Sequence, residues 1–400
     1  MLVATLLLMS LLTAYGYYFS RDLFAPFVIA PGVWCFILLL YVIMPGSLYP
    51  IQNHFPICLS VWMFCFVVIS MIVSSLVAPS SDNSCKAQPN KWVLRAYVTV
   101  SIVFVPIMLY VLIKQAFLED PENMFRYLRV MNTGADENIE MPNFGVLNYV
   151  VSLCYVTLFF VMIYFKNKKV ITAIVILNIL LALVTMAKTN FLCVFLTSFY
   201  ILYHRNIIKK KHMVYGGIGF VLFAFVLQSF RMGTNSSGEV EAVDTNDFFT
   251  MYLLTSIVAF DYYTVPFSAP SFGANTLRFL YAVGHSIGLT EEPVETILPF
   301  VGVPSFTNTY TNMYPFYTDF GIYGLVLFAA IYAVIYGFLY KKMQTGGQMS
   351  LILYAILLNF LVLEFIGEFI FTNMSLQIQY LFYAVVPFLL SVQTSGAKTD

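Results

Sequence analysis

The chain has 400 residues, of which 60% are apolar and only 10% are charged. Soluble domains are about 45–50% apolar and about 25% charged, so this composition excludes an ordinary soluble protein. It predicts an all-α polytopic integral membrane protein. Acidic and basic residues are equal in number, which leaves no basic surface for a nucleic acid, so we expect no nucleic-acid partner.

Apolar runs long enough to cross about 30 Å of hydrocarbon recur along the chain. We predict eleven spans, near residues 2–19, 23–44, 55–78, 92–116, 143–165, 170–187, 190–204, 213–230, 314–340, 349–367 and 373–392. The first run lacks the basic flank and cleavage site of a signal peptide, so we expect it to be retained. The run 251–267 is short and contains Asp261 and Pro266, which predicts a helix on or near the membrane surface.

Loop charges orient these spans. With the N-terminus outside, 14 of the 20 Lys and Arg residues fall on one side, which the positive-inside rule makes cytoplasmic. A twelfth span at 251–267 would move Lys341 and Lys342 to the other side and spoil this pattern. We therefore expect a periplasmic N-terminus, a cytoplasmic C-terminus and an acidic outer face. The inner loops are short and basic, with no nucleotide-binding motif, which disfavours a nucleotide-driven activity.

Two outer segments are large within what we interpret as a single membrane domain, residues 1–400. The segment 117–142 predicts a short amphipathic helix in which Asp120 is the N-cap and Arg126 and Arg129 share one face. The segment 231–313 is too long for a structureless loop, so we expect short helices within it and the functional residues in or beside it.

Isolated cations near the outer face are the candidate ligands for an anion. They are Arg231, Arg278 and Lys188, with Arg126 and Arg129 in the smaller loop. The planar guanidinium fork suits pyrophosphate because it donates two parallel charge-assisted bonds. The alternative role for each is an interfacial anchor.

Three carboxylates and one histidine are candidate general bases. Asp319 is expected in the first turn of the span that begins near Pro315, as a helix cap, a base or a carbohydrate ligand. Glu364 and Glu368 are four residues apart and are expected on one helix face, turned to a cavity or a partner such as an arginine. His285 lies two helical turns after Arg278, as a base, a ligand or a structural residue.

Tyrosines cluster with amides and hydroxyls in the segment 308–324. Tyr310, Asn312, Tyr314 and Tyr317 are candidate sugar ligands, because ring faces and neighbouring amides suit sugar rings; an aromatic belt at the membrane surface is the alternative. The cysteines and histidines show no metal-binding spacing, so we expect no metal and no cofactor.

Five motifs in this order carry a family resemblance over about residues 170–392. They are AKTNF (187–191), SFRMG (229–233), AFDYY (259–263), FGANTLRFLYA (272–282) and NTYTNMYPFYTDFGIYG (308–324). With the many spans and one dominant outer loop, the layout resembles the Wzy-type O-antigen and oligosaccharide repeat-unit polymerases. The related O-antigen ligases carry a His-Asn pair eleven residues before the glycine that is Gly321 here. This chain has Tyr310 and Thr311 there, which disfavours a ligase.

The resemblance implies a GT-C-like membrane glycosyltransferase of the bacterial inner membrane that makes O-antigen, capsule or exopolysaccharide. Its substrates would be undecaprenyl-pyrophosphate-linked oligosaccharides, and membrane lipids, a chain-length regulator and a flippase would be its partners. Arg231 and Arg278 would hold the pyrophosphate, and the base stays open among Asp319, His285 and a carboxylate of the tenth span. A ligase that transfers glycan to another acceptor and a flippase for the same lipid are the alternatives.

Overall fold

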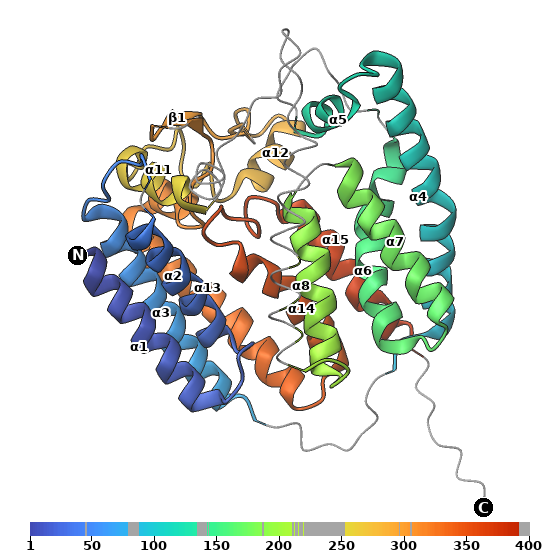
Figure 1. Ribbon diagram of the computed structural model, residues 1–400, viewed down its shortest axis with the longest axis horizontal. Helices are drawn as coiled ribbons and strands as arrows, with labels where there is room; N and C mark the ends of the chain where they lie inside the picture. The colour runs from blue at the N-terminus through green and yellow to red at the C-terminus, as the bar shows by residue number, and fades with distance from the viewer. Residues whose placement is uncertain are drawn as a thin grey trace, which may run out of the picture. The chain divides into compact units, whose positions relative to one another are not determined.

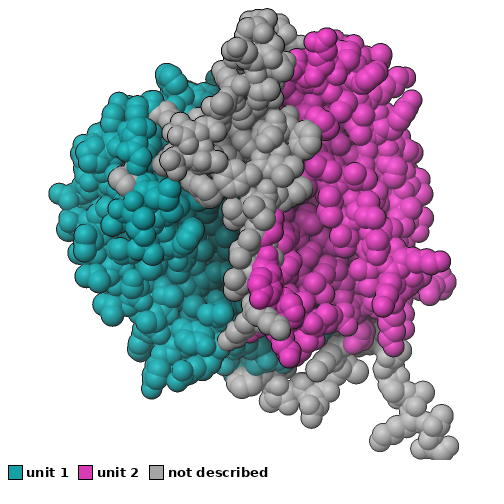
Figure 2. Space-filling view, viewed as in Figure 1, with its two compact units in different colours: residues 1–84, 243–377 teal, residues 85–242, 378–400 magenta. Residues whose placement is uncertain are grey.

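The computed structural model describes residues 1–44, 46–78, 88–133, 142, 144–185, 188–209, 212, 215, 219, 253–295, 297–304 and 306–391. These residues are mostly helical, which confirms the predicted all-α class (Figure 1). The chain divides into two compact units, which are coloured separately in Figure 2. Unit 1 comprises residues 1–84 and 243–377, and unit 2 comprises residues 85–242 and 378–400.

Unit 1 combines long apolar helices with short elements from the 231–313 segment. Its elements are α1 (Leu2–Ser20), α2 (Pro26–Ile43), α3 (His54–Leu76), α11 (Thr255–Tyr263), α12 (Arg278–Ser286), β1 (Val301–Gly302), β2 (Phe306–Thr307), α13 (Tyr314–Gln344) and α14 (Gln348–Val362). The two short strands pair antiparallel, with Val301 opposite Thr307. Helix α15 (Met374–Leu389) begins in this unit and continues into unit 2.

The centre of unit 1 is the contact between α3 and α13. The rings of Trp62 and Phe316 stack at 5.5 Å, and the hydroxyl of Ser74 donates a hydrogen bond of 3.2 Å to the carbonyl of Gly337. A Cβ at position 337 would lie 2.7 Å from the backbone oxygen of Ser70, so glycine is required for this close approach. The two helices therefore pack backbone against backbone at this point.

Helix α13 is interrupted at Gly321. It begins at Tyr314, close to the predicted start, and Pro315 occupies its first turn, where the missing N–H costs nothing. Gly321 has φ 60° and ψ −147°, a conformation that is essentially restricted to glycine. Asp319 is the sixth residue of the helix and lies just before this break. The prediction that Asp319 lies in the first turn is therefore wrong.

The helix predicted within 251–267 is present as α11, and its place on or near the membrane surface stays a prediction. Helix α11 is buried within unit 1, and every residue from 255 to 261 has little exposed surface. Asp261 is accommodated because its carboxylate accepts hydrogen bonds from the backbone N–H groups of Gln52, at 2.5 Å, and Phe55, at 2.7 Å. These donors lie at the N-terminus of α3, where the helix dipole favours a negative charge.

Unit 2 is wholly helical in its described part. Its elements are α4 (Lys91–Glu119), α5 (Met124–Thr133), a 3₁₀ turn η1 (Gly145–Asn148), α6 (Tyr149–Tyr164), α7 (Lys168–Val184), α8 (Lys188–His204) and most of α15. Helix α4 begins where the side chain of Asn90 accepts a hydrogen bond of 2.8 Å from the N–H of Trp92. Asp120 follows the last residue of α4 and α5 starts only at Met124, so the prediction of an N-cap at Asp120 is wrong.

Six of the described helices are long and apolar enough to cross a membrane: α1, α2, α3, α4, η1 with α6, and α13. Three shorter apolar helices lie at Asn190–His204, Gln348–Val362 and Met374–Leu389. The predicted span 213–230 lies outside the described residues, apart from positions 215 and 219. The chain is thus a multi-pass membrane protein, and the number of eleven spans stays a prediction.

Candidate active site

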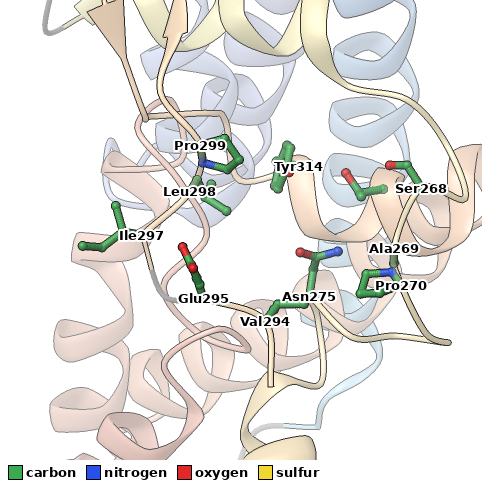
Figure 3. A pocket seen from close by; sticks show the side chains of 11 residues that line it. Ser268, Ala269, Pro270, Asn275, Val294, Glu295, Ile297, Leu298, Pro299 and Tyr314 are labelled. Atoms are coloured by element: carbon green, nitrogen blue, oxygen red, sulfur yellow. The ribbon is translucent and has the colours of Figure 1, made fainter. Parts of the chain in front are cut away.

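A pocket of about 320 Å³ lies in unit 1, between the loop that follows α11 and the segment that precedes β1. Its lining consists of Ser268, Ala269, Pro270, Asn275, Val294, Glu295, Ile297, Leu298, Pro299, Tyr314 and Thr318. Figure 3 shows the side chains of Asn275, Glu295 and Tyr314 around the same space. Among the described lining residues, Glu295 alone carries a charge. The lining thus offers a ring, an amide, hydroxyls and one carboxylate.

Asp319 fixes the wall of this pocket. One carboxylate oxygen accepts hydrogen bonds from Asn275, at 3.3 Å from its backbone N–H and 2.9 Å from its side-chain amide. The other oxygen accepts a bond of 2.7 Å from the backbone N–H of Thr276. Because Asp319 is buried and each oxygen already has a donor, its role in the structure is to hold the loop that carries Asn275.

Helix α12 carries both Arg278 and His285. The Nε of Arg278 donates a hydrogen bond of 2.6 Å to the carbonyl of Val294, which lines the pocket. Within the described part of the chain this is the only hydrogen bond of Arg278, so its terminal nitrogens remain for a ligand. His285 is exposed near the other end of the helix, with its Nδ1 3.3 Å from the carbonyl of Thr290.

Two of the candidate tyrosines lie at the pocket and one packs elsewhere. The rings of Tyr310 and Tyr314 are 4.5 Å apart, and the hydroxyl of Tyr310 lies 3.3 Å from the carbonyl of Pro299, to which it donates. Burial raises the pKa of Tyr310 to about 12, so this phenol is a neutral donor at physiological pH. Tyr317 instead packs its ring 4.7 Å from the ring of His54.

The carboxylate of Glu368 is hydrogen-bonded by the backbone of the turn that follows it. Its carboxylate accepts backbone hydrogen bonds from Ile370, Phe371 and Thr372, at 2.6, 2.9 and 2.7 Å, and another from the hydroxyl of Tyr332. Helix α14 ends at Val362, before either glutamate. The prediction that Glu364 and Glu368 share a helix face is therefore wrong, and the described contacts of both are with groups other than arginine.

Glu364 has a different environment. One of its carboxylate oxygens accepts a hydrogen bond of 3.1 Å from the indole nitrogen of Trp34. The other is buried and makes no hydrogen bond of normal length with the described residues, although the indole N–H of Trp62, which also lacks a partner, lies near this carboxylate as a possible donor. The backbone carbonyl of Glu364 accepts a bond of 2.8 Å from the N–H of Asn312, whose side-chain amide is also buried and unpartnered. Buried polar atoms are normally satisfied, so this pair is an exception that calls for an occupant or a function.

The segment 310–312 connects the pocket with the surroundings of Glu364. Tyr310 contributes to the pocket wall through Tyr314 and Pro299, and two residues later Asn312 is bonded to Glu364. The structure thus brings together Tyr310, Tyr314, Asp319 and Arg278 around the pocket, and Asn312 with Glu364 beside it.

Several residues of this region were not singled out by the sequence. Asn275 lies within the motif FGANTLRFLYA, which was a usable signal. Glu295 lies among other acids of the 231–313 segment, and Trp34 lies in a plain apolar run, so neither had a local signal. Their importance follows from contacts with residues far away in the sequence.

The remaining candidates belong to unit 2, and two of them are not described in full. Arg126 is exposed and Arg129 half-buried on α5, in unit 2. Lys188 is the first residue of α8, and its side chain lies outside the described part, as does all of Arg231. The described residues contain no group of three or more His, Cys, Asp and Glu side chains that could hold a metal ion.

Comparison with known proteins gives one match. A model of the O-antigen polymerase family matches residues 22–365, which is most of the chain and includes the pocket, Asn312 and Glu364. Searches of the curated proteins and of the solved structures return no match.

Proposed function

Because the chain belongs to the O-antigen polymerase family, a family of membrane enzymes that polymerise glycan repeat units, we propose that it joins undecaprenyl-pyrophosphate-linked oligosaccharides. The transfer takes place at the periplasmic face of the bacterial inner membrane and supplies O-antigen or capsular polysaccharide. The single observation that supports this role is the pocket, because its ring, amide, hydroxyls and carboxylate are the groups that recognise sugars.

The reaction needs little covalent chemistry from the protein. The hydroxyl of a new repeat unit attacks the anomeric carbon of the growing glycan and forms the new glycosidic bond. The bond between that carbon and the pyrophosphate oxygen breaks, and its electron pair leaves with the pyrophosphate. The protein therefore has to position two substrates, accept one proton and stabilise the leaving anion.

Arg278 and Arg231 hold the pyrophosphate in this proposal. Arg278 is supported by its terminal nitrogens, which have no described partner, and by its bond to Val294 at the pocket wall. A guanidinium binds two phosphate oxygens at once, so it stabilises negative charge as the pyrophosphate leaves. Lys188, Arg126 and Arg129 are further candidates for contact with the lipid-linked anion.

Glu364 is the base that we favour. Asp319 and Glu368 would each lose three or more hydrogen bonds, worth about 1.5–3 kcal/mol apiece for charged groups, before they could accept a proton freely. His285 is exposed at the far end of α12. Glu364 is the least engaged of the three carboxylates, because it accepts one hydrogen bond, from Trp34, and its other oxygen has only the neighbouring Trp62 indole as a possible donor.

The test uses the purified full-length protein with lipid-linked repeat units. A ladder of longer lipid-linked glycans is expected, with and without a metal chelator, since we propose a transfer that needs no metal. Transfer of glycan to a second, added acceptor instead would favour a ligase. Unchanged substrate that crosses the bilayer of a proteoliposome would favour a flippase, and either result would refute polymerisation.

A further inference from the structure

The pocket has a charge that does not suit the pyrophosphate. Its described lining includes Glu295 and no Lys or Arg, so an anion placed there would meet only a carboxylate. Arg278 approaches the wall from outside, through a bond to the carbonyl of Val294. The pocket and the pyrophosphate ligands are therefore separate subsites.

The remaining lining fits the ring of a sugar. Tyr314 supplies an aromatic side chain, which Figure 3 shows across the space from Asn275 and Glu295. Ser268 and Thr318 supply hydroxyls: that of Ser268 donates to the carbonyl of Val265 and can still accept a hydrogen bond, and that of Thr318 is buried beside the phenol of Tyr314. A volume of about 320 Å³ is at the small end of the range for ligand pockets, roughly 300–1,000 Å³, which suits one ring and its substituents and excludes an extended repeat unit.

We propose that this pocket holds one sugar of the glycan and that Glu295 determines which sugars it accepts. A carboxylate accepts hydrogen bonds from sugar hydroxyls and attracts a protonated amine, whereas it repels the carboxylate of a uronic acid. The pocket accordingly selects neutral and amino sugars against acidic ones. This inference rests on the proposed function, because it assigns the pocket to the glycan of that reaction.

Glu295 sets the charge of the pocket but does not contribute to the stability of the fold. Its side chain is exposed, and no described hydrogen bond of the fold uses its carboxylate. The neutral replacement Glu295→Gln therefore alters the charge of the pocket and retains the wall. Glu291 and Glu292, four and three residues earlier, are exposed carboxylates of the same segment that do not line the pocket, so they are matched controls.

The experiment measures binding of three synthetic trisaccharides to the purified full-length protein. They carry no lipid or pyrophosphate and differ only in one terminal sugar, which is glucose, glucosamine or glucuronic acid. We expect the wild type to bind the glucuronic acid compound roughly five- to thirty-fold more weakly than the glucose compound, the ratio that corresponds to about 1–2 kcal/mol of charge repulsion. Glu295→Gln should abolish that discrimination and weaken binding of the glucosamine compound, whereas Glu291→Gln and Glu292→Gln should leave all three affinities unchanged.

Equal binding of the acidic and neutral compounds by the wild type would overturn the inference, as would the same loss of discrimination in the control variants. The outcome is separable from that of the proposed function. Chain extension with lipid-linked substrate combined with no charge discrimination refutes the role of Glu295 alone. If the protein discriminates between the acidic and neutral compounds but does not extend chains, polymerisation is refuted and the assignment of the pocket as a sugar site is retained.

Discussion

Replacement of Asp319 by asparagine should loosen the pocket wall. The change keeps the shape of the side chain but converts one carboxylate oxygen into an NH₂ group. If the amide oxygen stays toward Asn275, the NH₂ group faces the backbone N–H of Thr276, and the 2.7 Å bond between them is lost. A hydrogen bond to a charged group is worth about 1.5–3 kcal/mol, and a buried N–H without a partner adds about 1–3 kcal/mol, so we expect a loss of about 3 kcal/mol in local stability. The opposite orientation sacrifices both bonds from Asn275 and costs at least as much.

Hydrogen–deuterium exchange of the detergent-solubilised protein measures this loss. A local cost of about 3 kcal/mol corresponds to roughly 100-fold faster exchange in the peptide that covers residues 271–277. Glycan binding at the pocket should weaken in parallel, while Glu291→Gln should behave as the wild type. Wild-type exchange in Asp319→Asn combined with lost polymerisation would refute the structural role and identify Asp319 as a group that acts in the chemistry.

Three further predictions concern other residues of the site. Arg278→Lys should reduce polymer formation at least tenfold at an unchanged protein level in the membrane, because a point charge replaces the guanidinium fork; normal polymer would leave Arg278 an anchor. Glu364→Gln should retain the bond from Trp34 and lower kcat by roughly 100-fold or more, as expected for a lost general base, without lowering Tm; a kcat within a few-fold of the wild type would exclude Glu364 as the base. The raised pKa of Tyr310 means that the neutral phenol is favoured in the folded state, so its contribution to stability is complete below pH 10 and is lost as the pH rises from 10 to about 12. The Tm should therefore fall more steeply with pH across this range for the wild type than for Tyr310→Phe. Identical slopes would show that Tyr310 does not titrate with the raised pKa.

The helices were predictable because each apolar run is a local pattern. The starts of α1, α3, α4 and α13 lie within a few residues of the predicted spans. The burial of helix α11 could not be predicted for a physical reason: burying Asp261 is costly, and the structure offsets that cost with hydrogen-bond donors at the start of α3, more than 200 residues earlier.

In the site too, local sequence patterns were informative and long-range contacts could not be predicted. Motif positions such as Tyr310 and Asn312 indicated the segment that leads into the pocket residue Tyr314, because their residue types are unusual between apolar spans. The roles of the carboxylates could not be predicted, since their donors are distant in sequence. Asp319 is bonded to residues more than 40 positions earlier, and Glu364 to Trp34, 330 positions earlier. Neither periodicity nor spacing encodes such pairs.

The break at Gly321 has a consequence for how this protein can vary. Its backbone conformation is one that L-amino acids rarely adopt, and a Cβ there would also lie 3.1 Å from the ring of Phe267. The neighbouring Tyr323 is exposed, so its side chain is under no such constraint. Gly321 thus sets the angle between the two helical segments of α13. The orientation of the pocket residues that precede it, Tyr314 and Thr318, depends on this angle. Mutational tolerance should therefore be low at Gly321 and at Gly324, where a Cβ would lie 2.2 Å from the backbone oxygen of Phe316, and high at Tyr323 between them.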